Sequence, residues 1–146
     1  MKKILTFAVA AIIVANTTTS CTKNDDNSIS SQVAALVQTA QTGNWKITSY
    51  IDNGVDETNH YTGYTFQFTS GGTVVATKTG ATTVNGTWSG GNDDSTLKLV
   101  LNFGAATPFL ELNDDWHVTQ QSSAIIKLED VSGGGGGTEY LTFEKI

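Results

Sequence analysis

The sequence contains no arginine, and its eight basic residues, all lysines, face fourteen aspartates and glutamates. The formal net charge is −6 at pH 7. Proteins that bind nucleic acids need basic side chains to displace counterions from phosphates, and the planar fork of arginine is the group best suited to that contact. We therefore expect no nucleic acid among the partners of this chain.

Cysteine is almost as scarce, since Cys21 is the only one in 146 residues. Exported domains of this size often rely on disulfides, and a disulfide within one chain needs two cysteines. The stability of the domain must therefore come from side-chain packing and from the hydrogen bonds of its sheet.

The position of Cys21 indicates a bacterial lipoprotein signal peptide. Lys2 and Lys3 precede an uncharged run over 4–15, and a short segment of threonine and serine leads into the cysteine. This apolar run is too short for a membrane-spanning helix, which needs about 20 residues. We predict that residues 1–20 are removed and that lipid on Cys21 anchors the protein to the outer membrane, facing the periplasm or the cell surface.

An ordinary cleaved signal peptide followed by a chance cysteine is the alternative, because Thr18 and Thr19 differ from the aliphatic residues common before a lipid-bearing cysteine. Residues 21–28 are predicted to form a polar tether. Lys23, Asp25 and Asp26 within it are similar to short signals that send some lipoproteins to the cell surface, although a solvated linker explains them equally well.

One helix is predicted over 29–42, where apolar residues recur at the spacing of a single helical face. Gly43 follows where a left-handed residue commonly ends a helix. From there to the C-terminus the apolar period is two, most clearly at the odd positions over 97–103. Turn residues separate eight such segments, or nine if 109–112 is also a strand.

These patterns predict that 29–146 is one all-β domain: an antiparallel up-and-down β-barrel of about eight strands, preceded by one short N-terminal helix. A barrel is favoured because closure leaves no unpaired edge strand. A β-sandwich is the alternative architecture.

Gly43, Asn44 and Trp45 stand at the head of the first predicted strand. This glycine-x-tryptophan opening resembles the lipocalins, and more closely the lipocalin-like domains of bacterial lipoproteins, over 43–146. The resemblance implies a barrel whose mouth holds a small apolar or amphiphilic molecule. In lipocalins the tryptophan packs against a late arginine, and here Lys145 is the cation that could face the indole of Trp45.

Three tryptophans, Trp45, Trp88 and Trp116, fall on the inward-facing positions of their strands. Together with Tyr64 and Phe66 they are the candidate ligand-binding residues, because aromatic rings near a barrel mouth can stack on a ligand. The structural interpretation is that they are the large residues of a small core, and the alternation of residues supports both.

No metal site or cofactor is predicted. His60 and His117 are the only histidines, and a zinc site would need a carboxylate close to them. Paired acids at Asp56–Glu57, Asp93–Asp94 and Asp114–Asp115 occur in predicted turns, where aspartate bonds local backbone groups. We do not expect an enzyme; a hydrolase using two such carboxyls is the alternative.

Two functions agree with these observations. The first is a lipid-anchored envelope lipoprotein whose lipocalin-like barrel binds a small apolar or amphiphilic ligand. The second is a structural or interaction protein of the cell envelope, with a filled barrel, no small ligand and a protein partner. An unfilled interior would favour the first, and a filled one the second.

The lipid anchor gives a direct prediction. Replacing Cys21→Ala should release an intact, folded domain into the soluble periplasmic fraction, because the cysteine contributes nothing to the predicted core. Fractionation followed by immunoblotting measures the distribution. A Cys21→Ala protein that stays in the membrane fraction would show that the anchor is misassigned.

Overall fold

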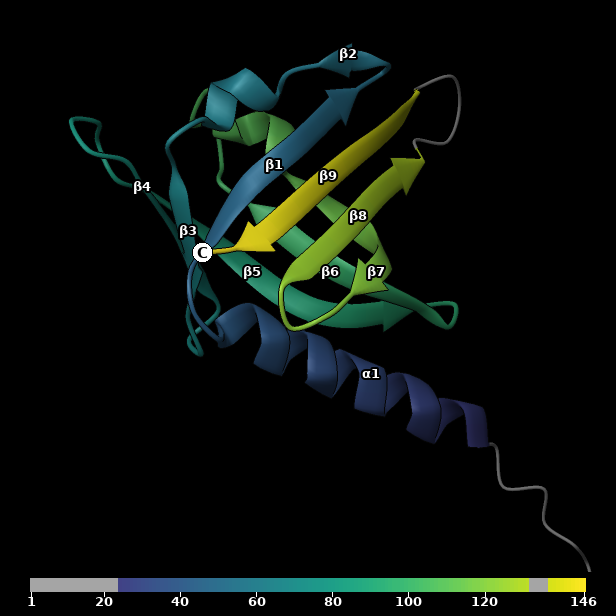
Figure 1. The fold of residues 1–146 in the computed structure, drawn as a ribbon. Helices are drawn as coiled ribbons and strands as arrows, with labels where there is room; N and C mark the ends of the chain where they lie inside the picture. The colour runs from purple at the N-terminus through teal and green to yellow at the C-terminus, as the bar shows by residue number, and fades with distance from the viewer. Residues whose placement is uncertain (1–23, 132–136) are drawn as a thin grey trace, which may run out of the picture.

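The computed structural model describes residues 24–131 and 137–146, which form one closed β-barrel with a helix against it (Figure 1). Cys21, the signal peptide and residues 21–23 of the predicted tether lie outside the described residues. The helix is α1 (Asn24–Gln41), and two short 3₁₀ helices are η1 (Thr58–Tyr61) and η2 (Phe109–Leu112). The strands are β1 (Trp45–Asp52), β2 (Val55–Asp56), β3 (Thr65–Phe68), β4 (Thr73–Thr77), β5 (Val84–Asp93), β6 (Thr96–Asn102), β7 (Asp114–Gln121), β8 (Ile125–Val131) and β9 (Thr138–Lys145).

The sheet is an antiparallel meander in the order β2-β1-β3-β4-β5-β6-β7-β8-β9. It closes because β1 also pairs with β9 at six positions, from Trp45 opposite Lys145 to Ile51 opposite Tyr140. Since β2 pairs only with β1, the other eight of the nine strands form the barrel. The predicted up-and-down barrel is confirmed, and the sandwich alternative is not the architecture.

Helix α1 lies across β5 and β6 at one end of the barrel (Figure 1). Its close approach depends on Gly90, where an added Cβ would stand 2.8 Å from a methyl carbon of Val37. Gly43 follows the helix with a φ of 81°, the left-handed conformation that the sequence predicted there.

The helix begins at Asn24, five residues before the predicted start. Residues 24–28, assigned to the tether from their polarity, therefore belong to α1. Adding turns to a helix that is already docked costs little, because only nucleation is unfavourable. Apolar periodicity marks the docked part of a helix and cannot mark a polar first turn.

The segment 109–112 is the 3₁₀ helix η2 and not a ninth strand. Phe109 and Leu112 are both buried, because residues three apart lie on the same side of a 3₁₀ helix. The ninth strand is instead β2, a two-residue partner of β1. The sequence could not separate η2 from a short strand, since four residues with buried ends fit both.

Aromatic rings fill the barrel interior. Phe66 makes edge contacts with Phe103 and Phe143 at ring-centre distances of 6.3 and 5.4 Å, and Phe143 also meets Phe68 at 5.6 Å. Edge-to-face pairs of this kind stabilise a core beyond the area they bury. The buried apolar residues of the described chain belong to one cluster that includes α1 through Leu36 and Ala40.

Trp45 joins the end of α1 to the closing strands. Its indole N–H donates to the carbonyl of Ala40 at 2.9 Å, so the buried ring has its polar atom satisfied. The ammonium of Lys145 stands 4.9 Å from the centre of the ring. Lys145 therefore supplies the cation that the sequence suggested for this indole.

Lys98 departs from the predicted pattern, which placed it on the wet face of its strand. It is only 8% exposed, and its ammonium donates to the Asp115 carbonyl at 3.1 Å. In β6 it stands between Gly91 on β5 and His117 on β7, and its stem lies along the sheet toward Asp115. Alternation assigns a side to a residue and does not determine how far its neighbours cover it.

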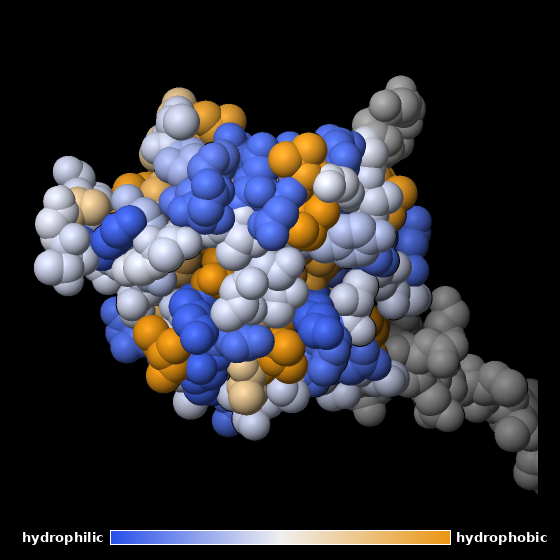
Figure 2. Space-filling model, turned by 45° about the horizontal axis from the view of Figure 1, so that its top comes forward, coloured by the Kyte–Doolittle hydropathy of each residue, from blue (hydrophilic) through white to orange (hydrophobic). Residues whose placement is uncertain are grey.

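The face in view in Figure 2 is covered mainly by hydrophilic and intermediate side chains, with hydrophobic ones in small patches between them. Such small patches are ordinary for a protein surface. Among the described residues, no helix has the length and apolar character needed to cross a bilayer.

The tight packing of β5 on β6 gives a matched pair of substitutions. Gly86→Ala should destabilise the domain by about 1–3 kcal/mol, the usual cost of overpacking, because the new Cβ would lie 2.7 Å from the Asn102 carbonyl oxygen and from the Phe103 ring. Gly91→Ala on the same strand meets no atom within 4 Å and should be nearly neutral. Urea unfolding measures both; equal stabilities would contradict this account of the packing.

Candidate functional site

The candidate ligand residues are, with one exception, part of the core. Trp45, Trp116 and Phe66 are fully buried and Trp88 is 6% exposed. The other two indole N–H groups donate to main-chain carbonyls, Trp88 to Thr69 at 3.0 Å and Trp116 to Leu112 at 3.0 Å. These rings are therefore packed in the core, and their polar atoms are bonded within the fold.

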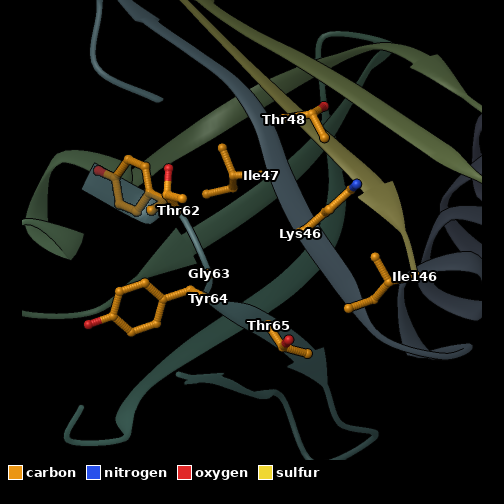
Figure 3. A pocket seen from close by; sticks show the side chains of 9 residues that line it. Lys46, Ile47, Thr48, Thr62, Gly63, Tyr64, Thr65 and Ile146 are labelled. Carbon is orange, nitrogen blue, oxygen red and sulfur yellow. The ribbon is translucent and has the colours of Figure 1, made fainter. Parts of the chain in front are cut away.

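Tyr64 is the exception, because it is half-buried and lines a groove between β1 and β3. The two strands share a single paired position, Trp45 opposite Phe66, and then diverge. The opening that results has a volume of about 370 Å³. We call it the β1–β3 groove; it is lined by Lys46, Ile47, Thr48, Tyr61, Thr62, Gly63, Tyr64, Thr65 and Ile146 (Figure 3).

The wall of the groove formed by 61–65 is held by contacts to η2. The ring of Tyr64 packs edge-on against Phe109 at 4.9 Å, and the ammonium of Lys78 lies 5.2 Å from its centre. The Tyr61 hydroxyl bonds with the Pro108 carbonyl at 3.2 Å. This wall is therefore fixed by packing, while its main chain is not paired with β1.

A second feature lies beside the groove, where η1 meets η2 at the end of the barrel away from α1 (Figure 1). The Nδ1 atom of His60 is 3.5 Å from Oε2 of Glu57 and 3.4 Å from Oε2 of Glu111. We call these three side chains the Glu57–His60–Glu111 cluster. A zinc site at His60 was not predicted because nothing in the sequence indicated a carboxylate beside it, and the fold brings two carboxylates there.

His117, the other histidine, stands half-buried on β7, opposite Lys98 on one side and Glu129 on the other. It is not part of the cluster around His60. The described chain therefore does not bring its two histidines into one site.

Two buried tyrosine hydroxyls support the cluster. Tyr61 bonds to Oε2 of Glu111 at 3.3 Å, and Tyr50 bonds to the Glu111 carbonyl at 3.1 Å and to Oε2 of Glu139 at 3.3 Å. Burial first, and then the nearby carboxylates, raise the pKa of both phenols. Both therefore stay protonated and donate their hydrogen atoms at any physiological pH.

Carboxylates crowd the same end of the barrel. Burial raises the pKa of Glu139, and the negative charge of Asp52 raises it further. Burial likewise raises the pKa of Asp114, with Asp130 adding to the effect. For Asp115 burial acts in the same direction, but hydrogen bonds from Asp114 and Lys98 outweigh it, so its pKa is lowered.

Of the paired acids in the sequence, Asp114 and Asp115 are joined by Asp130, whose carboxylate oxygen lies within 4.8 Å of theirs. Glu57 of the Asp56–Glu57 pair meets Glu111. Neither arrangement can be predicted from sequence spacing, because each brings together residues that are far apart in the chain. The hydrolase alternative concerns carboxyls of this kind, and here they lie at a partly exposed rim.

The fold defines the class of the protein as a closed antiparallel β-barrel with an N-terminal helix. A solved structure of similar fold is that of a DUF4847 family protein from Bacteroides vulgatus ATCC 8482. The similarity covers 76% of this chain and 97% of that protein, with a TM-score of 0.52 and 17% sequence identity. No protein-family model and no curated protein matches the sequence. At this identity the likeness shows the fold alone.

The carboxylates at this end predict how stability changes with pH. The pKa of Glu139 is higher in the folded state than its unfolded value of about 4.3. Protonation of Glu139 therefore stabilises the fold; this contribution is complete at a pH below the unfolded pKa and is lost as the pH rises through the folded pKa. Glu139→Gln keeps a neutral acceptor for Tyr50, so we expect a gain of at most about 1 kcal/mol at pH 7, since the group is partly exposed.

Urea unfolding of this variant and its parent at pH 3.5 and pH 7 measures the effect. The gain should be present at pH 7 and absent at pH 3.5. Glu129→Gln on β8 controls for the change in net charge. A Glu139→Gln protein that is less stable than its parent at pH 7 would contradict the expectation.

Proposed function

We propose that this protein is a lipid-anchored envelope protein with a lipocalin-like barrel, and that the barrel serves as an interaction module with a packed interior. The partner is a polypeptide of the cell envelope, and the β1–β3 groove takes an extended segment of it. The filled core is the observation that favours an interaction module over a barrel that binds a small ligand in its interior. The anchor and the location come from the sequence and form part of the proposal.

The interior supports an interaction protein because the side chains that could hold a ligand hold one another. Phe66 contacts three other phenylalanines, and the Tyr50 ring packs edge-on against Trp116 at 6.5 Å. A ligand inside the barrel would have to displace rings that are completely buried. Displacement would cost the packing and edge contacts that stabilise the fold.

The groove supports a polypeptide partner because one edge of β1 faces segment 61–65 there without a ladder. Beyond Trp45, residues 46–48 of β1 stand opposite 61–65, and the ladder does not continue. Unpaired main-chain groups on a strand edge bind extended peptides by adding a strand. Three residues of β1 offer about 10 Å of edge, enough for a short extended segment.

The side chains around this edge suit an extended segment as well. Figure 3 shows Ile47 on the side of β1 that faces Thr62, with Lys46 and Thr48 on the other side; the Ile47 side chain is only 6% exposed and belongs to the core. Ile146 adds an apolar side chain that is 61% exposed at one end of the groove. A partner residue can therefore rest on apolar surface while its backbone bonds the strand edge.

Crosslinking in cells tests the proposal. A photoreactive amino acid replaces Thr62, which is exposed in the groove, or Thr119 on β7, which β8 and β9 separate from β1. We expect a discrete crosslinked envelope protein from position 62 only. A synthetic peptide of the crosslinked segment should then bind the purified Cys21→Ala protein and slow hydrogen exchange at Ile47 and its neighbours.

Thr62→Trp should fill the groove and weaken binding of that peptide by at least about tenfold, or 1.4 kcal/mol. Thr119→Trp is the matched control and should bind as the parent does. Equal crosslinking from both positions would contradict the proposal. So would a repeatable added mass in native mass spectrometry that is lost on unfolding, because it would indicate a ligand inside the barrel.

A further inference from the structure

The Glu57–His60–Glu111 cluster brings one nitrogen and two carboxylate oxygens to a common point. These three atoms all lie within 4.8 Å of one another, although Glu111 is 51 residues from His60 along the chain. The side chains are between 27 and 38% exposed, so an ion in solution can reach them. The cluster is a separate feature from the β1–β3 groove and shares none of the residues that line it.

The spacing of these atoms suits a shared metal ion, and the two contacts of Nδ1 are long for charged hydrogen bonds. A charged imidazolium that bonds a carboxylate stands about 2.7–2.9 Å from it, whereas Nδ1 of His60 is 3.4 and 3.5 Å from its two neighbours. Ligands of a tetrahedral zinc ion with bonds of about 2.05 Å are separated by about 3.4 Å, the edge of the tetrahedron. The two distances from Nδ1 are close to such an edge, and the two carboxylate oxygens lie within 4.8 Å of each other.

The backbone around η1 sets two of the three ligands. Glu57 precedes η1 and the His60 N–H donates to the Glu57 carbonyl at 3.0 Å, which closes one 3₁₀ turn. In a 3₁₀ turn the residues at i and i+3 eclipse each other, so both side chains leave on the same side. The pair is therefore placed by local structure before the third ligand is added.

Tyrosine hydroxyls set the third ligand. Tyr61 shares its hydroxyl hydrogen between Oε2 of Glu111 and the Pro108 carbonyl, and Tyr50 shares its own between the main-chain carbonyl of Glu111 and Oε2 of Glu139. Metal-binding carboxylates commonly receive such a bond from an outer residue, which fixes their orientation. Tyr61 also lies next to His60 in the chain, so one residue links both halves of the cluster.

We propose that Glu57, His60 and Glu111 bind a single divalent cation of the zinc class, with the remaining coordination open to water. Two carboxylates balance the charge of the ion, and a neutral imidazole supplies the nitrogen that zinc prefers over calcium or magnesium. Three protein ligands and an open position make this an exchangeable site rather than a closed structural one.

Asp114, Asp115 and Asp130 form the competing cluster, and their chemistry differs. All three ligands are oxygens, and the ammonium of Lys98 already lies 3.4 Å from Oδ2 of Asp115. A bound cation there would face a buried positive charge. The experiment must still distinguish binding at this acidic cluster from binding at the Glu57–His60–Glu111 cluster.

Calorimetric titration of the metal-free protein with zinc chloride tests the site, using the full chain with Cys21→Ala so that no thiol competes. We expect one zinc ion per chain and an increase in the melting temperature on binding. His60→Asn, Glu111→Gln and Glu57→Gln should each weaken zinc binding by at least about tenfold, the lower end of what the loss of an outer-shell partner costs.

Matched controls are His117→Asn, which removes the other histidine, and Glu144→Gln, which removes a carboxylate at the far end of β9; both should bind zinc as the parent does. The visible absorption of bound Co²⁺ reports the coordination number independently, and an intense band is expected. Thermal unfolding without metal confirms that each variant folds, and Glu57→Gln is the mildest change because no hydrogen bond from that side chain caps η1.

Three results would overturn the proposal. One is a folded parent protein that takes up no zinc. Another is an unchanged zinc affinity after His60→Asn. The third is binding that survives His60→Asn and is lost in Asp130→Asn, which would place the ion in the acidic cluster.

Discussion

The pairing of β1 with β9 is the interaction on which the rest of the structure depends. It joins the first long strand to the last, and without it the meander would be an open sheet with two free edges. Closure turns the inward positions of every strand toward one another, so that the phenylalanines and tryptophans meet in a single core. It also fixes Lys145 over Trp45 and so connects the helix to the closing strands.

The same pairing accounts for the opening beside it. A bulge lies between Ile47 and Ser49 in the ladder with β9, and bulges increase the local twist of a strand. β1 follows β9 through this bulge and leaves β3 after one paired position. The 3₁₀ helix η1 then crosses the gap and bonds to β1 from the side, as the Tyr50 N–H donates to the hydroxyl of Thr58 at 2.8 Å. Closure on one side of β1 and opening on the other therefore have a common origin.

Most of the barrel could be predicted from the sequence because a half-buried strand must alternate. Leu99, Leu101 and Phe103 are buried at the odd positions that the pattern assigned, and the three tryptophans point inward. The pattern failed where a residue's environment depends on its neighbours in space. Lys98 is covered although it is on the outer face, and Phe109 is buried from a 3₁₀ turn.

The candidate sites were less accessible to prediction for the same reason. Nothing in the spacing of Glu57 and His60 indicates that Glu111 will join them, because that contact depends on how η1 and η2 fold over the end of the barrel. The β1–β3 groove follows from a bulge and a change of twist, which leave no mark in an alternating sequence. The aromatic residues can be recognised in the sequence, but an inward-facing position does not distinguish a ligand pocket from a core.

The early start of α1 changes how the domain stands relative to an anchor. Eighteen helical residues extend about 27 Å as a stiff rod, and only Thr22 and Lys23 separate that rod from Cys21. A lipid at Cys21 would then hold the barrel through a rigid helix and not through a flexible linker. The helix would set the distance of the barrel from the bilayer and its tilt. The end of the barrel that carries η1 and η2, on the side away from the helix, would face outward from the bilayer (Figure 1).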